Sequence, residues 1–340
     1  MAVVTKTRNP VIYIILNGSI FICICIAILL IADFVFFTSL REIKNDTVEK
    51  GSTGNMSPSI DSGMPHITDQ EFQAIRDLVY DRFGINLTEE KKVMVAGRLQ
   101  KILRKYGFKT FHEYYLYLVE DQTNQTIGEL ANQITTNHTF FYREAEHFRF
   151  FMGTILPEIT AKKKRRDDDR DLRIWCAAAS SGEEPYDIIM CMMEYFGKDY
   201  AAWDAGVLAT DISEKSMSMA NAGVYEPCRV QTLPDLYKEK YFHRAGENWA
   251  INEDVKKEVT LRYFNLMNKH LPFQKPFDCI WCRNVMIYFD HKTKLELVDR
   301  LYEKTSPGGY LLIGHSESLG RGKTRWDYVR PAIYKKHLKE

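Results

Sequence analysis

Short apolar runs alternate with stretches of helical spacing along the whole chain from residue 172 onward. Strands that alternate with helices are typical of an α/β fold with a doubly wound, mostly parallel sheet. Sheets of this kind bind ligands beyond the carboxyl ends of their strands, where the strand order reverses. The predicted strands are Leu172–Cys176, Gly206–Ala209, Thr260–Phe264, Phe277–Cys282 and Tyr310–Ile313, and the predicted helices are Tyr186–Phe196, Ser213–Ala222 and Thr293–Lys304.

The stretch Arg173–Tyr186, RIWCAAASSGEEPY, joins the first strand to the first helix of this pattern. Small residues let the backbone approach a ligand, and a helix N-terminus offers N–H groups there. Gly182 is its only glycine, so the dinucleotide pattern G-x-G-x-x-G is missing, and the adjacent acids Glu183 and Glu184 would repel a phosphate. We therefore expect a cationic or hydroxyl-bearing ligand, a description that S-adenosylmethionine fits.

The composition bounds the class of protein. With 340 residues, 45% of them apolar, the chain is long enough for two globular domains and an appendage. A net charge of +1 predicts no nucleic-acid partner. The seven cysteines, two of them in the apolar run at 11–32 and the rest scattered, do not form a disulfide framework, which favours a reducing compartment. The pair Cys279 and Cys282 lies in a predicted strand, where the two side chains would face opposite sides, so we expect no metal site.

The first 44 residues differ from the rest. Residues 11–32 are mostly Ile, Leu, Phe and Cys, long enough for a transmembrane helix that would anchor a cytoplasmic catalytic part to the inner membrane. Basic residues flank both ends, so charge does not decide the orientation. Alternatively, the native start is Met56 or Met64, and the protein is cytosolic. Residues 45–65, rich in Gly, Ser, Asn and Pro, are a predicted flexible linker.

An all-helical domain is predicted over residues 66–136. Thr68 and Glu71 form a capping box, and apolar residues follow at helical spacing until Gly84. A connecting segment with a helix would occupy residues 137–171, and the α/β domain residues 172–340. The further predicted helices of the N-terminal domain are Thr88–Tyr106, Phe111–Val119 and Ile127–Thr136.

Polar residues follow several of the predicted strands. Asp211 ends one strand, where a carboxylate can accept both ribose hydroxyls of a nucleoside or simply favour the next helix start. Arg283 and Asn284 follow another strand, and as an isolated pair they would serve only the loop backbone. The stretch 135–143, TTNHTFFYR, mixes hydroxyls, aromatics and a guanidinium, which suits a pocket wall or interdomain packing.

Five ordered motifs resemble the chemotaxis-receptor glutamate O-methyltransferase family: TTNHTFFYRE, AAASSGEEPY, ATDIS, CRNVMIYF and PGGYLLIGHSES. The resemblance covers about residues 67–334. It implies a helical N-terminal domain, a Rossmann-like S-adenosylmethionine-binding domain and a small β-subdomain inserted at about 227–262. The product would be S-adenosylhomocysteine. Arg143 and Tyr288 would face the substrate carboxylate. The implied cofactor contacts are Asn137, Thr139, Arg143, Glu184, Asp211, Asn265, Leu266, Arg283 and Asn284.

Two features bear on how the acceptor would dock. The stretch Phe242–Trp249 is short, with one glycine, where receptor-tethered members of the family carry a longer glycine-rich loop; we expect docking without a tether. A basic helix face could meet acidic receptor helices, or it could simply be solvated. Its residues are Arg98, Lys101, Arg104 and Lys105.

The expected chemistry is methyl transfer to a glutamate, which is already ionised at neutral pH and needs no general base. Catalysis would then consist of holding the carboxylate in line with the methyl group. Two alternatives remain open: the same cofactor with another acceptor, or a membrane-tethered module that binds cofactor or receptor without catalysis. Intact Arg143 and Tyr288 argue against the second.

Overall fold

The computed structural model describes residues 65–340 except 122–124, 136–137, 166–168, 321 and 339–340. The predicted transmembrane helix at 11–32, the remainder of 1–44 and the linker up to residue 64 lie outside the described residues. Within the described part, no helix is long and apolar enough to span a membrane.

The helical domain begins at the predicted capping box. The Thr68 side chain accepts a hydrogen bond from the Glu71 backbone, the Glu71 carboxylate accepts one from the Thr68 backbone, and Gly84 ends the helix at φ +67°. The predicted helix from Thr88 starts instead as a 3-10 turn, η1, and becomes α-helical at Lys92. The elements are α2 (Asp69–Phe83), η1 (Glu89–Lys91), α3 (Lys92–Tyr106), α4 (Phe111–Glu120) and α5 (Gln125–Ile134).

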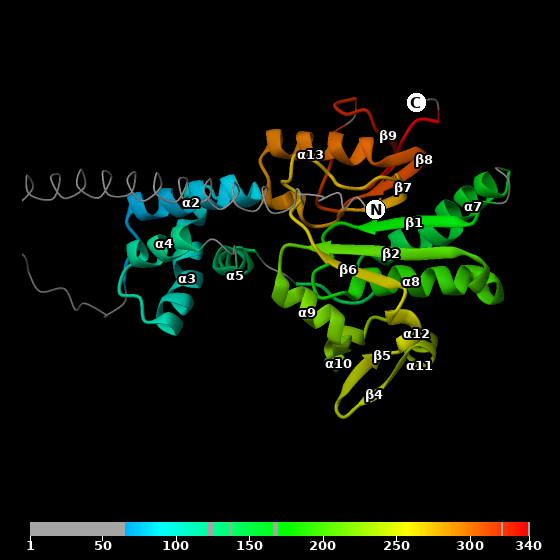
Figure 1. Cartoon of the computed structure of the whole chain (residues 1–340), viewed down its shortest axis with the longest axis horizontal. Helices are drawn as coiled ribbons and strands as arrows, with labels where there is room; N and C mark the ends of the chain where they lie inside the picture. The colour runs from blue at the N-terminus through cyan, green and yellow to red at the C-terminus, as the bar shows by residue number, and fades with distance from the viewer. Residues whose placement is uncertain (1–64, 122–124, 136–137, 166–168, 321, 339–340) are drawn as a thin grey trace, which may run out of the picture. The chain divides into compact units, whose positions relative to one another are not determined.

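The α/β part is built on a sheet with the order β6-β2-β1-β7-β8-β10-β9 (Figure 1). The first five strands in this order are parallel, and β10 is antiparallel to both of its neighbours. The mostly parallel α/β sheet is therefore confirmed. The strands are β1 (Asp171–Cys176), β2 (Asp204–Asp211), β6 (Val259–Tyr263), β7 (Phe277–Trp281), β8 (Thr305–Leu312), β9 (Asp327–Arg330) and β10 (Ile333–Lys335).

A second, three-stranded antiparallel sheet with the order β3-β5-β4 lies between β2 and β6 in the chain. It runs from Val224 to Ile251, whereas residues 259–262 of the expected insert belong to β6 of the large sheet. Its strands are β3 (Val224–Tyr225), β4 (Phe242–Ala245) and β5 (Asn248–Ile251); the helices α10 (Pro227–Val230) and α11 (Asp235–Tyr241) lie between its strands, and α12 (Glu253–Lys256) follows them.

Helices cover both faces of the large sheet. Figure 1 shows α8 and α13 on opposite sides of it. Because side chains alternate along a strand, Cys279 packs into the core under α8 and Cys282 into the core under α13. The two thiols therefore face opposite sides, as predicted. The remaining elements are α6 (Ala145–Phe150), the π-helical turn η2 (Phe151–Ile155), α7 (Leu156–Lys164), α8 (Glu183–Phe196), η3 (Gly197–Ala202), α9 (Glu214–Ala222), η4 (Met286–Tyr288) and α13 (His291–Glu303).

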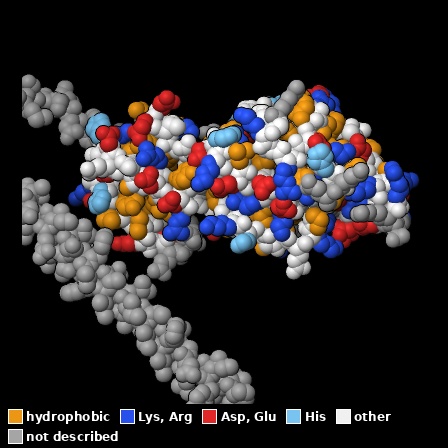
Figure 2. Space-filling model, turned by 90° about the horizontal axis from the view of Figure 1, so that it is seen from above, with side chains coloured by type: hydrophobic (Ala, Val, Ile, Leu, Met, Phe, Trp, Pro, Cys, Tyr) orange, Lys and Arg blue, Asp and Glu red, His pale blue; other side chains and the backbone are white. Residues whose placement is uncertain are grey.

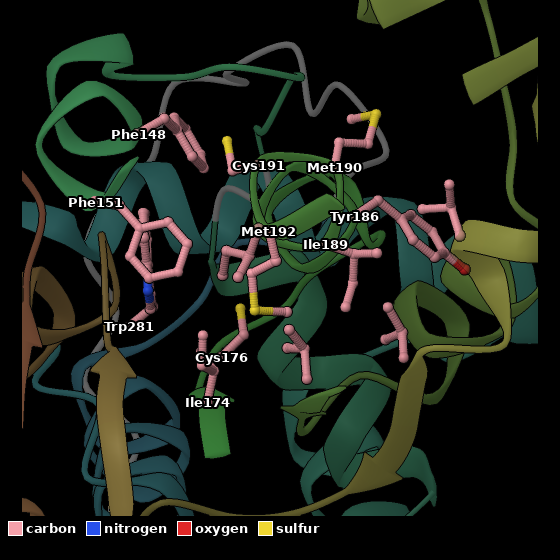
Figure 3. Close-up of a cluster of buried hydrophobic side chains, with 14 of the residues drawn as sticks. Phe148, Phe151, Ile174, Cys176, Tyr186, Ile189, Met190, Cys191, Met192 and Trp281 are labelled. Carbon is pink, nitrogen blue, oxygen red and sulfur yellow. The ribbon is translucent and has the colours of Figure 1, made fainter. Parts of the chain in front are cut away.

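The larger core joins the connecting segment to the sheet. Figure 3 shows Phe148 and Phe151 packed on Trp281 of β7, and the apolar face of α8 turned toward Ile174 and Cys176 of β1. The Phe148 and Trp281 rings are stacked, with centroids 5.0 Å apart. This packing fixes the segment just after Arg143 against the strand that leads to Arg283.

Gly182 precedes α8 at φ +96°, and a Cβ there would lie 2.8 Å from Ala220 Cβ and 2.9 Å from the Tyr225 hydroxyl. We predict that Gly182→Ala lowers the free energy of unfolding by about 2–4 kcal/mol, because left-handed strain adds to overpacking. Thermal unfolding checks it. Gly97→Ala, on an open face of α3, is the control and should be neutral or slightly stabilising; equal losses in both variants would contradict the interpretation.

Candidate functional site

The loops that follow β1, β2 and β7 meet at one edge of the large sheet and line a single cavity, together with residues from the connecting segment and the helical domain. The structure thus brings together nine of the ten residues predicted for cofactor and substrate. Asn137, the tenth, lies outside the described residues. The nine are Thr139, Arg143, Glu184, Asp211, Asn265, Leu266, Arg283, Asn284 and Tyr288.

Asp211 stands at the end of β2 with both carboxylate oxygens held by backbone N–H groups. Ser180 donates to Oδ2 at 2.7 Å, and Ser213 donates to Oδ1 at 2.9 Å. Burial raises the pKa of Asp211, and these N–H groups partly offset the effect. The carboxylate is therefore fixed in direction, with its remaining lone pairs available to the cavity.

Arg283 is buried between two carboxylates that lie far from it in sequence. Its Nη1 donates to Glu184 at 2.6 Å, and its Nη2 donates to Glu144 at 3.0 Å and to the Arg143 carbonyl at 2.6 Å. Burial opposes ionisation of Arg283 and of Glu144. The two carboxylates nevertheless raise the pKa of Arg283, and Arg283 lowers the pKa of Glu144. Most of the guanidinium's donors are thus used within the protein, so Arg283 shapes the cavity wall more than it offers free donors to a ligand.

The two adjacent acids of the SGEEP motif have different environments. Glu183 is fully buried, accepts from Ser181 and is paired with Arg229, so it serves the start of α8. Glu184 lines the cavity, accepts from Arg283 and the Cys176 thiol, and has a pKa raised by burial. Of these two acids, only Glu184 lines the cavity and can face a ligand there.

Arg143 and Tyr288 are both half-buried and line the cavity from different segments. The Arg143 guanidinium donates to the His138 carbonyl at 2.7 Å. Tyr288 ends η4, and its carbonyl accepts from the Asn86 backbone at 2.8 Å, next to a β-bridge between Ile85 and Phe289. The helical domain therefore contacts the loop that carries Tyr288.

The remaining wall is apolar, with Ile212, Phe264 and Leu266 lining the cavity. Asn265 lies between the last two, but its amide donates to the Arg82 carbonyl at 2.7 Å and accepts from the Met267 backbone at 2.9 Å. The predicted contact of Asn265 with a cofactor would thus have to use the second N–H of the amide or the second lone pair of its oxygen.

The cavity fits the expected cofactor in its donor set. An oriented carboxylate at Asp211 suits ribose hydroxyls, apolar side chains suit a purine, and Glu184 suits a cationic amino or sulfonium group. Ser180 adds a buried hydroxyl that has no hydrogen-bond partner within the described residues. Because S-adenosylmethionine carries all of these groups, the residues present are compatible with it.

Some site residues were not predicted. Ser180 has a left-handed backbone, φ +48°, which is strained for a residue other than glycine. Residues with such strain cluster at functional sites. Glu144 accepts from Arg283, and Glu317 accepts from the Asn284 backbone, so both acids hold the loop after β7. Neither role was predicted, although both residues lie inside the motifs quoted above. The available sequence signal was an acidic residue inside each motif. The partners of these acids could not be derived from the sequence.

The predicted docking face on α3 is only partly free. Arg98 is half-buried and donates to the carbonyls of Gln133 and Ile134 at the end of α5, and Lys105 pairs with Glu129 at 2.8 Å. Lys101 and Arg104 are exposed. Over the side seen from above in Figure 2, which is not the α3 face, basic and acidic side chains are interspersed. Arg98 is therefore tied to α5, and the contact of this face with acidic receptor helices stays a prediction.

One group of side chains has the composition of a metal site. Ligand atoms of Glu144, His147 and His315 lie within 4.8 Å of one another. Both oxygens of Glu144, however, accept from the His315 backbone, and one also accepts from Arg283. A cation there would have to compete with a guanidinium, so we assign no metal to this group.

Comparison with known proteins gives a consistent result. Residues 137–334 match the model described as CheR methyltransferase, SAM binding domain, and residues 70–135 match CheR methyltransferase, all-alpha domain. A chemotaxis protein methyltransferase of Borreliella burgdorferi is 41% identical over 80% of this chain and 96% of its own length. The chemotaxis protein methyltransferase of Escherichia coli is 35% identical over 79% of this chain and 91% of its own.

The buried His147 predicts a pH dependence of stability. Burial and the nearby Arg283 lower its pKa to about 3, below the ordinary value near 6.5. The unfolded chain therefore binds the extra proton first, and stability is lost as pH falls below about 6.5. We predict a loss of about 2 kcal/mol from this residue between pH 7.5 and 5.

Thermal unfolding at the two pH values tests this prediction. His147→Asn should unfold with a shallower pH dependence than the wild type, whereas His112→Asn, at an exposed position, should keep the wild-type dependence. Identical pH dependence in the wild type and His147→Asn would show that His147 is not the titrating group.

Proposed function

The chain belongs to the CheR methyltransferase family, and on that premise we propose that it transfers methyl groups from S-adenosylmethionine to glutamate carboxylates of chemotaxis receptors. The observation that carries the proposal is the match of both family domains over residues 70–334, in a chain whose expected site residues line one cavity. It is an S-adenosylmethionine-dependent methyltransferase with a mostly parallel α/β domain and an all-helical N-terminal domain.

We assign the cofactor contacts to the cavity wall. Asp211 would accept the ribose hydroxyls, because Ser180 and Ser213 already orient its carboxylate. Ile212, Phe264 and Leu266 would surround the purine, and Glu184 would face the amino group. When bound, S-adenosylmethionine supplies an electrophilic methyl group. Arg283 holds Glu184 in place. The proposed set is completed by Asn137, Thr139, Arg143, Asn265 and Asn284.

Arg143 and Tyr288 are the proposed substrate residues. A glutamate is ionised at neutral pH, so the chain needs to orient it and not to deprotonate it. A guanidinium forms charge-assisted hydrogen bonds with a carboxylate, and a phenol can add one more. Both side chains line the same cavity as Glu184 and Asp211, which supports their assignment to the reacting end.

The acceptor surface is proposed to include Lys101, Arg104 and Lys105 on α3. Lys101 and Arg104 are exposed, and Lys105 could exchange its surface pairing with Glu129 for an acidic receptor helix. We further propose that residues 11–32 anchor the protein to the inner membrane, with the catalytic part in the cytoplasm. Co-sedimentation with membranes that is lost when the chain begins at Met56 tests the anchor.

The proposed activity is tested with S-adenosylmethionine labelled in its methyl group and membranes that contain the cognate receptors. We predict label in the receptor that alkali releases as methanol, because a glutamyl methyl ester is base-labile. Label that alkali does not release would point to another acceptor group. Tight cofactor binding without any transfer would point to a binding module.

Arg143→Ala should lower kcat by about 10²–10³-fold, because an oriented charged donor is lost from the reacting end. The thermal midpoint should stay close to that of the wild type, since the Arg143 side chain is half-buried and its one described bond is to the His138 carbonyl. Arg149→Ala removes a neighbouring, exposed arginine and serves as the control with unchanged kcat. Wild-type rates in Arg143→Ala would remove it from the site.

A further inference from the structure

Glu317 is a buried carboxylate, 5% exposed, that lies beyond the end of β8. Among the described residues it forms no salt bridge; its partners are backbone N–H groups. Asn284 and Gly314 donate to Oε2 at 3.0 and 2.6 Å, and Ile287 donates to Oε1 at 3.1 Å. One carboxylate thus joins the loop after β8 to the loop after β7.

The loop after β7 turns sharply at Asn284. Asn284 has a left-handed backbone, φ +57°, and the 3-10 turn that ends in Tyr288 follows directly. A Cβ at Gly314 would lie 3.0 Å from the Asn284 nitrogen and still closer to its amide. Glu317 and Gly314 therefore fix both where Asn284 lies and where the turn begins.

Both ends of this loop face the cavity through Asn284 and Tyr288. The bond from Ile287, the residue before Tyr288, transmits the position of Glu317 to the phenol. An amide in place of the carboxylate could accept on one oxygen only, and its NH₂ group would oppose one of the N–H donors. A carboxylate with both oxygens accepting therefore suits this position better than an amide.

We propose that Glu317 is a positioning residue for methyl transfer, which sets the place of Tyr288 and Asn284 through their backbone. This inference rests on the proposed function. Because a displacement of about 1 Å at a reacting group can cost about 10²-fold in rate, Glu317→Gln should lower kcat by about 10–100-fold.

A double-mutant cycle with Tyr288→Phe distinguishes positioning from loss of stability. If Glu317 acts in part through the phenol, Glu317→Gln should lower kcat by a smaller factor in the Tyr288→Phe background than in the wild type. The control is Asp278→Asn, an equally buried carboxylate at the opposite end of β7 that is paired with Lys163. It should lower the thermal midpoint and leave kcat unchanged.

Equal rate losses from Glu317→Gln in both backgrounds, or a matching rate loss in Asp278→Asn, would overturn the proposal. Hydrogen exchange of the Asn284, Ile287 and Gly314 amides should accelerate in Glu317→Gln whether or not the wild type methylates receptors. Unchanged exchange would overturn the positioning role, whereas accelerated exchange in a wild type without methyl transfer would count against the proposed function alone. Glu317→Asp, too short to reach both loops, serves if Glu317→Gln does not fold.

Discussion

The site depends on a guanidinium that is buried between two carboxylates. Arg283 joins the end of β7 to Glu184 at the start of α8 and to Glu144 in the connecting segment. Removing one partner of such a cluster leaves a buried charge without compensation, which typically costs about 3–5 kcal/mol. Packing on Phe148 and Trp281 holds the cation in the same place. The cluster therefore fixes three chain segments that each carry a cavity residue.

This arrangement divides the charged residues by role. Glu183 is paired with Arg229 inside the protein. Asp211 and Arg143 line the cavity, and Glu184 both lines it and pairs with Arg283. Backbone N–H groups orient the acids Asp211 and Glu317 without neutralising them. A site that must hold a cationic cofactor and an anionic substrate gains from this arrangement, because charged groups that are already fixed in place need no reorganisation when the ligands bind.

Much of the fold could be predicted from sequence, since apolar runs and caps are local signals. Strands β1, β2 and β7 and the C-terminal ends of α2 and α3 followed from such patterns. The short strands β9 and β10 were missed: β9 is largely exposed at the sheet edge and shows little apolar periodicity. The meeting of Asp211, Glu184 and Asn284 was predictable because parallel strands end at one edge. Residues 11–32 lie outside the described part of the chain, so the predicted anchor stays a prediction.

Partners distant in sequence could not be derived in this way. Arg283 lies 99 residues from Glu184 and 139 from Glu144, and no local pattern indicates that they meet. The same holds for Arg98, whose bonds to the end of α5 follow from helix packing. The left-handed backbone of Ser180 is likewise imposed by tertiary contacts, because serine has no intrinsic preference for it.

The most direct test of this account is a crystal structure of the protein with S-adenosylhomocysteine. We expect the ribose hydroxyls on Asp211, the sulfur facing the space between Arg143 and Tyr288, and Arg283 still between Glu144 and Glu184. A ligand bound away from Asp211, or an Arg283 side chain that has left both acids to bind the ligand, would contradict the account.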